Sequence, residues 1–362
     1  MNTAAVTPAG LDRIVPAIEL QIGWCRANGS PFTANVLEAI RDNLTGGGAF
    51  APLVVPWAGN PLADALSLRL AGALHLMVRV GRAPGLAPYY PPYDPQRGRA
   101  AWDGAAVGRE IEAAVSANLA FVRDVLTRPP QTNEIGRSAV LMPGYAEIAR
   151  RTGLALRILE LGASAGLNLM WDRYAYRYGE RLVGRAGAPL TVAAEWRGPW
   201  CGVVDLPRVV ERRGCDRSPI DLQEPGAADR LMSYVWPDQV ERLTRLEAAI
   251  ALAQREKPAL EKADAAAWLE QRLATPAPGV ATVVVHTIVW QYFSKETAAR
   301  ARAALNEAGE RASAEAPLAW LSLEQYSGDQ PPELRLTLWP GGERQTLARA
   351  HPHGAWVEWL GG

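Results

Sequence analysis

The sequence is poor in the features that mark secreted and membrane proteins. Its 362 residues include only three cysteines, too few and too scattered for a disulfide framework. No basic cluster followed by an apolar core opens the chain, so no signal peptide is expected. The longest apolar stretch, 280–293, is interrupted by polar residues and is too short to span a bilayer. These absences predict a cytoplasmic protein with no membrane partner.

Net charge is absent as well. The 38 lysines and arginines balance the 38 aspartates and glutamates, whereas nucleic-acid binding needs a basic patch. We therefore expect no nucleic-acid partner. Histidines are scarce too. His351 and His353 alternate along a possible strand, but two imidazoles without a third ligand make a poor metal site, and no metal is expected.

What the chain has is apolar residues (48%) and length enough for two folding units. Residues 1–135 are predicted to be a helical N-terminal region, because apolar residues recur every three to four positions along 36–44, 62–77 and 107–126. Residues 136–362 are predicted to be an α/β domain with a mostly parallel sheet, a C-terminal antiparallel hairpin and an insert at about 180–208.

Within the α/β region, strands are expected at 156–161, 209–216, 280–289, 318–323 and 334–338, with 356–360 returning antiparallel after the Pro340-Gly341-Gly342 turn. Helices are expected at 138–151, 168–178, 240–250, 265–273 and 298–308. Ser218-Pro219-Ile220-Asp221 resembles a helix start, with a capping serine followed by proline. The run 280–289 is apolar throughout, which is typical of a strand buried on both faces.

The most informative stretch is 156–169, LRILELGASAGLNL. An apolar strand ends at Gly162, and Gly166 follows four residues later, so the pattern predicts a strand, a tight glycine turn and a helix. Glu160 places a carboxylate at the carboxyl end of this strand. In open parallel sheets, that end is where ligands bind.

Two chemistries fit this stretch. Gly162-Ala163-Ser164-Ala165-Gly166 matches G-x-S-x-G, the nucleophile elbow of serine hydrolases, and Ser164, Asp264 and either His351 or His353 follow in the required order. No oxyanion loop of the HGGG type precedes it, however, and the region upstream is helical. Phosphate-binding motifs fail, because Ser164 replaces a needed glycine and Leu167 follows Gly166.

The other fit is E-x-G-x-x-x-G, in which the chain resembles class I S-adenosylmethionine-dependent methyltransferases. The resemblance implies a Rossmann-like fold, S-adenosylmethionine as cofactor, and a methyl acceptor that is a small molecule or a protein. It also implies carboxylates at the ends of the next strands, one for the ribose hydroxyls and one for the adenine amino group. The cofactor-binding residues implied are Glu160, Gly162, Ala163, Ser164, Gly166, Asn168, Asp216 and Asp264. Asp264 also suits a helix N-cap.

A closer resemblance covers nearly the whole chain. The segments 131–134 (QTNE), 159–169, 214–216 (GCD), 219–221 (PID) and 353–354 (HG) are similar to the uncharacterised bacterial family called domain of unknown function 2332. This family carries no established reaction. The resemblance therefore implies a methyltransferase-like fold but no particular activity.

Several further residues are candidates for the substrate cleft or for catalysis. His286 lies in the apolar strand, and an imidazole there is either a hydrogen-bonded core residue or a general base that faces the transferred methyl group. The candidates for the substrate cleft are Gln131, Asn133, Arg137, Trp290 and Tyr292. We therefore predict a methyltransferase, with a serine hydrolase using Ser164 and a non-catalytic S-adenosylmethionine-binding protein as the alternatives.

Overall fold

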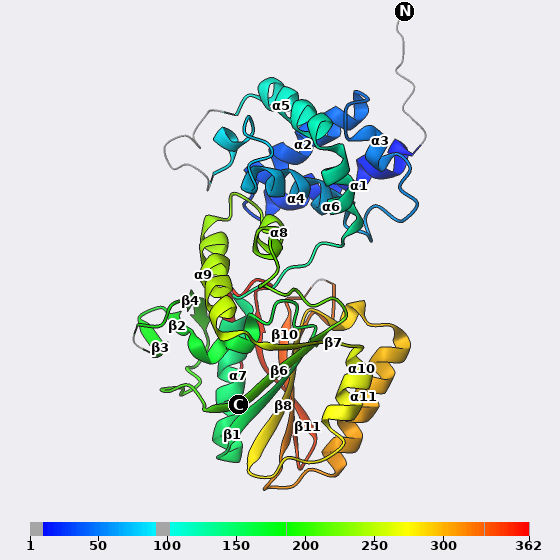
Figure 1. Ribbon diagram of the computed structural model, residues 1–362. Helices are drawn as coiled ribbons and strands as arrows, with labels where there is room; N and C mark the ends of the chain where they lie inside the picture. The colour runs from blue at the N-terminus through cyan, green and yellow to red at the C-terminus, as the bar shows by residue number, and fades with distance from the viewer. Residues whose placement is uncertain (1–9, 92–101, 186, 329, 362) are drawn as a thin grey trace, which may run out of the picture. The chain divides into compact units, whose positions relative to one another are not determined.

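The structure is a computed structural model that describes residues 10–91, 102–185, 187–328 and 330–361. The chain divides into two compact units (Figure 1). Unit 1 comprises residues 1–132 and 226–244. Unit 2 comprises residues 133–225 and 245–362. The chain thus leaves unit 2 after Pro225 and returns to it at Arg245, and Asn133 is the first residue of unit 2.

Unit 1 is helical, as the sequence predicts. Its helices are α1 (Leu11–Ala27), α2 (Pro31–Thr45), α3 (Ala51–Val54), α4 (Leu66–Arg79), α5 (Gly104–Ala117), α6 (Leu119–Thr127) and α8 (Ala227–Ser233), with a 3-10 turn at Ala87–Tyr89. Their apolar faces form one buried core that includes Ile14, Leu37, Leu70 and Val122. Burying such side chains contributes about 1.5–3 kcal/mol each.

Two predictions for unit 1 are wrong in detail. The helix predicted over 107–126 is broken at Asn118, which leaves the helical conformation (φ −130°) and donates from its side-chain amide to the carbonyl of Ala114. The stripe that was predicted to begin at Leu62 begins later, because α4 starts at Leu66 and Leu62 is exposed. Apolar spacing located the helices, but it carried no signal for these boundaries.

Unit 2 is built on a nine-stranded, mostly parallel sheet with the strand order β5-β12-β11-β10-β9-β8-β1-β6-β7. The parallel part consists of β1 (Ala155–Leu161), β6 (Val209–Asp216), β7 (Ala259–Lys262), β8 (Val280–Thr287) and β9 (Leu318–Glu324). An antiparallel meander follows, consisting of β10 (Glu333–Trp339), β11 (Glu343–Ala350) and β12 (Trp356–Trp359). Short β5 (Glu195–Arg197) pairs with β12 in parallel.

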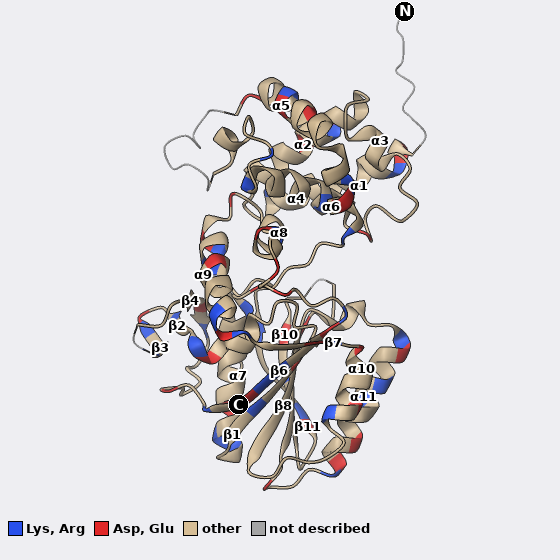
Figure 2. Ribbon diagram, in the orientation of Figure 1, with Lys and Arg blue, Asp and Glu red and all other residues tan. Residues whose placement is uncertain are grey.

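Helices cover both faces of this sheet. On one face, α10 (Ala265–Arg272) and α11 (Lys295–Glu310) pack on Leu161, Val284 and Trp320 (Figure 1). On the other face lies α7 (Arg137–Thr152), whose Gly144 meets Leu321. The remaining long helix, α9 (Val240–Glu256), begins in unit 1 and ends in unit 2. Charged residues of both signs lie along α11 (Figure 2), as on a solvated face.

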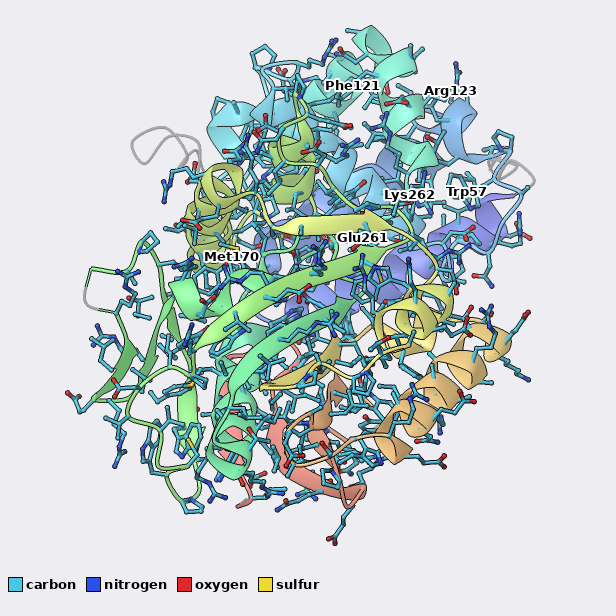
Figure 3. All side chains as sticks on the ribbon, turned by 60° about the horizontal axis from the view of Figure 1, so that its bottom comes forward. Trp57, Phe121, Arg123, Met170, Glu261 and Lys262 are labelled. Atoms are coloured by element: carbon cyan, nitrogen blue, oxygen red, sulfur yellow. The ribbon has the colours of Figure 1, made fainter. Side chains whose placement is uncertain are left out.

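The predicted strands 156–161, 209–216, 280–289 and 318–323 are confirmed within one or two residues. The edge strand β7, which carries Glu261 and Lys262 (Figure 3), was not predicted, since it is short and polar. Nor was β11. It follows the Pro340-Gly341-Gly342 turn directly, so β12 returns only one strand later.

Three other local predictions are wrong. The helix predicted over 168–178 is a 3-10 turn, Asn168–Arg173, followed by β2 (Ala175–Tyr178). The hydroxyls of the buried Tyr174 and Tyr176 donate to backbone carbonyls of the preceding turn, and these hydrogen bonds stabilise the non-helical backbone. With β3 (Arg181–Gly184) and β4 (Thr191–Ala193), β2 forms a small separate sheet. No helix starts at Ser218, where Asp216 accepts the backbone N–H instead. His351 and His353 lie in a turn.

Candidate functional site

The candidate site lies at the carboxyl ends of β1, β6 and β8. In the sheet, β1 lies between β6 and β8. Along the chain, the parallel strands run β1, β6, β7, β8 and β9, so β6 and β7 are added on one side of β1, and β8 and β9 on the other. The strand order therefore reverses at β1. In open α/β sheets, ligands bind outside the carboxyl ends of the strands at such a switch point.

The glycine turn after β1 has a backbone that few side chains tolerate. Gly162, Ser164 and Gly166 all have positive φ, at 66°, 54° and 72°. A Cβ atom on Gly162 would lie 2.4 Å from the Cγ2 atom of Val289, in the loop after β8. Glycine at position 162 therefore permits both the turn and the close approach of the two loops.

Asp216, the last residue of β6, ties this turn in place. One carboxylate oxygen accepts the backbone N–H of Ser164 at 3.0 Å, and the other accepts that of Ser218 at 2.8 Å. Each carboxylate oxygen has two lone pairs, so each can accept one further hydrogen bond. The acid is partly exposed. It is therefore both a structural link and a group that a ligand can reach.

A cavity of about 190 Å³ opens beside Asp216. Three of the predicted cofactor-binding residues line it together: Gly162, Asp216 and Asp264. Val289 and Phe293 supply apolar walls. The carboxyl ends of parallel strands meet at one edge, which is why Gly162 and Asp264, 102 positions apart in the sequence, share this space.

Asp264 also caps the N-terminus of α10, which is the structural role that the sequence allowed for it. Its Oδ1 atom accepts the backbone N–H groups of Ala266 and Ala267, at 3.0 and 3.2 Å, and its Oδ2 atom accepts the Thr297 hydroxyl at 3.2 Å. A cap and a cavity wall are compatible, since the carboxylate retains lone pairs. Tyr292, a predicted cleft residue, lines the same cavity and is exposed.

Glu160 is buried and does not line this cavity. The side chain is 2% exposed, and its Oε2 atom has no hydrogen-bond partner. Burial raises the pKa of the Glu160 carboxyl to about 8, and the Asp216 carboxylate adds to the increase, while Arg137 opposes it. At neutral pH the group is therefore mostly protonated. A buried polar atom without a partner is costly, which makes it a candidate for contact with a ligand.

The polar segment before α7 reaches the glycine turn. Asn133 accepts the backbone N–H of Leu167 at 2.9 Å, and Asn168 donates to the Glu134 carbonyl at 3.4 Å. Arg137 donates to the carbonyls of Pro352 and Thr287. Of these two predicted cleft residues, the structure thus brings Asn133 to the glycine turn and Arg137 to the carboxyl end of β8. Gln131 belongs to unit 1.

The sequence reasoning missed a charged cluster beside this segment. The Glu134 carboxylate lies 3.5 Å from Arg245 and 3.4 Å from the Nδ1 atom of His353, and it accepts the backbone N–H of Gly136 at 3.0 Å. Glu134 and His353 stood in segments similar to family 2332, which was the available signal. No sequence signal pointed to Arg245, because helical spacing predicts only which face of a helix a residue occupies and not its partner.

His286 is buried with a partner at each ring nitrogen. The indole N–H of Trp320 donates to Nε2 at 2.9 Å, and Nδ1 lies 2.6 Å from the Oε1 atom of Glu324. The proton therefore sits on Nδ1, and imidazole donates to Glu324. Glu324 also accepts the backbone N–H of Val289, which fixes the loop after β8. Service as a general base would require Trp320 to release Nε2.

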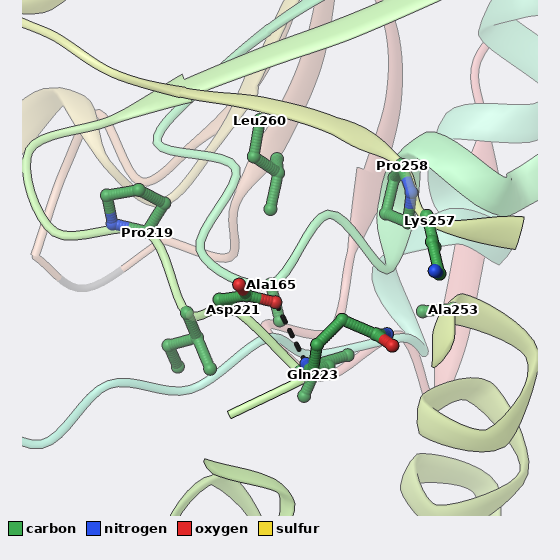
Figure 4. Close-up of a pocket in the computed structure, with 10 residues that line it drawn as sticks. Ala165, Pro219, Asp221, Gln223, Ala253, Lys257, Pro258 and Leu260 are labelled. Carbon is green, nitrogen blue, oxygen red and sulfur yellow. Dashed lines mark hydrogen bonds between the residues drawn. The ribbon is translucent and has the colours of Figure 1, made fainter. Parts of the chain in front are cut away.

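A larger cavity, of about 330 Å³, lies near Ala165 of the glycine turn (Figure 4). Pro219, Asp221, Lys257 and Pro258 are among its lining residues. Asp221 accepts the backbone N–H of Gln223, drawn as a dashed line. This cavity holds one acid and one base. The Asp216 cavity instead has two carboxylates, Asp216 and Asp264, and one arginine, Arg217.

The chain belongs to a bacterial protein family. Residues 17–359 match the model of the family described as "Uncharacterized protein conserved in bacteria (DUF2332)". No curated protein and no solved structure is similar enough to match. In the described ranges, no helix is long and apolar enough to cross a membrane. Nor do three or more His, Cys, Asp or Glu side chains there form a group that could hold a metal ion.

Proposed function

We propose that unit 2 binds S-adenosylmethionine in the cavity beside Asp216 and transfers its methyl group to a small-molecule or protein acceptor. The observation that carries this proposal is the meeting of Gly162, Asp216 and Asp264 in one cavity at the switch point of the sheet. The parallel strands follow the order 3-2-1-4-5 of Rossmann-type folds, and β10 beside them is antiparallel. These features support a class I methyltransferase fold and, with it, a cytoplasmic enzyme.

The residues present fit this cofactor. A nucleoside needs acceptors for its ribose hydroxyls, an acceptor for its amino group and an apolar surface for its ring. Asp216, Asp264 and Phe293 are of those three types. The cavity is smaller than the roughly 300–1,000 Å³ of typical ligand pockets, so we assign it the adenosine part alone. We assign the charged part to Glu160, which lies outside the cavity lining and has an unpartnered Oε2 atom.

Each residue then has a distinct task. Asp216 accepts the two ribose hydroxyls, Asp264 accepts the adenine amino group, and Gly162 lets the backbone approach closely. When bound, S-adenosylmethionine supplies an electrophilic methyl group. Asn133 and Arg137 orient the acceptor, and Trp290 and Tyr292 flank it. Most of the rate acceleration of such a site comes from alignment and the exclusion of water.

Thermal shift with a matched pair of variants tests the proposal. A ligand at one hundred times its dissociation constant adds ~2.7 kcal/mol, which for a unit of this size raises the melting temperature by ~5–10 °C. We expect S-adenosylmethionine and S-adenosylhomocysteine to give this shift and NAD and ATP to give none. Asp216→Asn should abolish the shift. Asp221→Asn, which removes an acid from the other cavity, should retain it. The absence of a shift with either methionine-derived ligand would refute the proposal.

One observation favours a second candidate, a serine hydrolase. Ser164 combines a positive φ with a buried hydroxyl that has no partner, as in a strained nucleophile elbow. Among the described residues, however, no imidazole contacts Ser164. A fluorophosphonate that labels wild type but not Ser164→Ala would support the hydrolase. S-adenosylmethionine binding without transfer to any acceptor would instead indicate a binding protein.

A further inference from the structure

A second polar cavity lies in unit 2, on the face of the sheet that α11 covers. Its volume is about 210 Å³, and its lining includes His286 of β8 and Trp320 and Glu324 of β9. Residues of β10 and β11 complete it. None of its lining residues except Trp290 has a part in the proposed methyl transfer, so it requires a separate account.

Three guanidinium groups surround this cavity, each from a different element. Arg302 comes from α11, Arg335 from β10 and Arg344 from β11. Arg335 is paired with Glu333 at 2.7 Å. In the part of the chain that the structure describes, neither Arg302 nor Arg344 has a carboxylate partner. Three guanidinium groups therefore line the cavity with a single carboxylate, that of Glu324, so the lining carries an excess of positive charge.

Aromatic rings hold these arginines in position. The Arg344 guanidinium carbon lies 5.3 Å from the ring centroid of Trp320, and that of Arg302 lies 5.8 Å from the ring of Trp290. The two indole rings lie 5.5 Å apart. Stacking on a ring leaves the N–H edge of a guanidinium free to donate. The cavity thus combines flat apolar walls with fixed, unfilled donors.

The Glu324 carboxylate offsets only part of this positive charge. The Oε1 atom of Glu324 already faces His286 and accepts the backbone N–H groups of Val289 and Trp290. The other polar groups are hydroxyls, of which Ser322 and Tyr326 bond each other at 2.8 Å. Hydroxyls can donate to an anion. The lining therefore favours a negatively charged ligand.

We propose that this cavity binds a small organic anion that has a carboxylate and a flat apolar body. The carboxylate matches the planar donor fork of Arg344, which can bind it with two parallel hydrogen bonds. The flat body matches the indole walls. A cavity of about 210 Å³ suits a single ring better than a nucleotide.

Isothermal titration calorimetry at low, fixed ionic strength tests the proposal, with benzoate as the probe. We expect saturable benzoate binding and no binding of benzamide, which has the ring without the charge. Arg344→Ala should weaken benzoate binding by about ten- to a hundredfold, the loss of a charge-assisted hydrogen bond. Arg349→Ala is the matched control, because it removes the same charge from the same strand at an exposed position outside the cavity.

The outcomes divide cleanly. Benzoate binding that is lost in Arg344→Ala and kept in Arg349→Ala supports the site, and Arg302→Ala provides a second, exposed position at which the loss should recur. Equal weakening by Arg344→Ala and Arg349→Ala would reduce the effect to net charge and overturn the site. So would binding of inorganic phosphate as tight as that of benzoate, or no benzoate binding at all.

Discussion

Replacing Glu160 with glutamine should stabilise the protein at alkaline pH and change little in mild acid. The carboxyl is buried, its Oε2 atom has no partner, and burial followed by the Asp216 carboxylate raises its pKa from 4.5 to about 8. Glutamine has nearly the same shape and no charge at any pH. The substitution therefore removes the titration while keeping the packing.

The sign of the effect follows from proton binding. Between pH 4.5 and pH 8, the folded protein holds a proton on Glu160 that the unfolded chain has released. The free energy of unfolding therefore falls as the pH rises through this window, and the contribution is fully lost above pH 8. Each pKa unit corresponds to ~1.4 kcal/mol, so the shift to about 8 represents ~5 kcal/mol. Glu160→Gln should escape this loss.

Amide hydrogen exchange of β1 measures the effect in the sheet that holds the residue. Wild type, Glu160→Gln and Glu307→Gln, an exposed control on α11, are compared with one another at pH 5, 7 and 9. The Glu160→Gln variant should match wild type at pH 5 and be more stable by several kcal/mol at pH 9. A difference of the same size at pH 5 and pH 9 would refute the argument. The control should track wild type throughout.

Three more predictions address the site and its supports. Gly162→Ala should cost ~1–2 kcal/mol for its left-handed backbone plus ~1–3 kcal/mol for overpacking. In chemical denaturation, Gly153→Ala should show only the first cost, because its φ of 69° is similar but no atom lies within 4 Å of the added Cβ. Glu324→Ala should destabilise by ~3–5 kcal/mol because it strands His286 and two backbone N–H groups. Glu324→Gln should cost less, since it can still accept, and equal losses in the two variants would contradict this account. If Glu160 faces the sulfonium, calorimetry should show affinity for S-adenosylmethionine rising about tenfold per pH unit up to about pH 8, with no such rise in Glu160→Gln.

The parallel core could be predicted because its strands carry strong local signals. The run 280–287 is almost wholly apolar, as burial on both faces requires. The edge strand β7 has no such run, because Glu261 and Lys262 face solvent or ion partners there. The helix predicted over 168–178 failed for a related reason. Its aromatic spacing fits a helix, but pairing of β2 with β3 and β4, and hydrogen bonds from the tyrosine hydroxyls to nearby carbonyls, stabilise another backbone.

The candidate site was predictable to the extent that topology determines it. Parallel strands bring their carboxyl ends together, so Gly162 and Asp216 could be expected in one place. Asp264 follows β7, which was not predicted, and only the methyltransferase resemblance implied its role. The environment of each residue could not. The sequence does not show that Trp320 occupies the Nε2 atom of His286, or that Glu134 meets Arg245, since these contacts join distant segments through side-chain packing.

Several features at and beside the glycine turn lower the stability of the folded protein, which argues for a function at this end of the sheet. Ser164 has a left-handed backbone and a buried hydroxyl without a partner, and Glu160 holds a buried carboxyl at a pKa of about 8. Each of these features lowers the stability of the empty protein by about 1–3 kcal/mol or more. An alanine and a glutamine would relieve two of them without disturbing the sheet. Strain and unpaired polar atoms that gather at the switch point are best explained by a ligand that satisfies them, and a cation beside Glu160 is the simplest one that would.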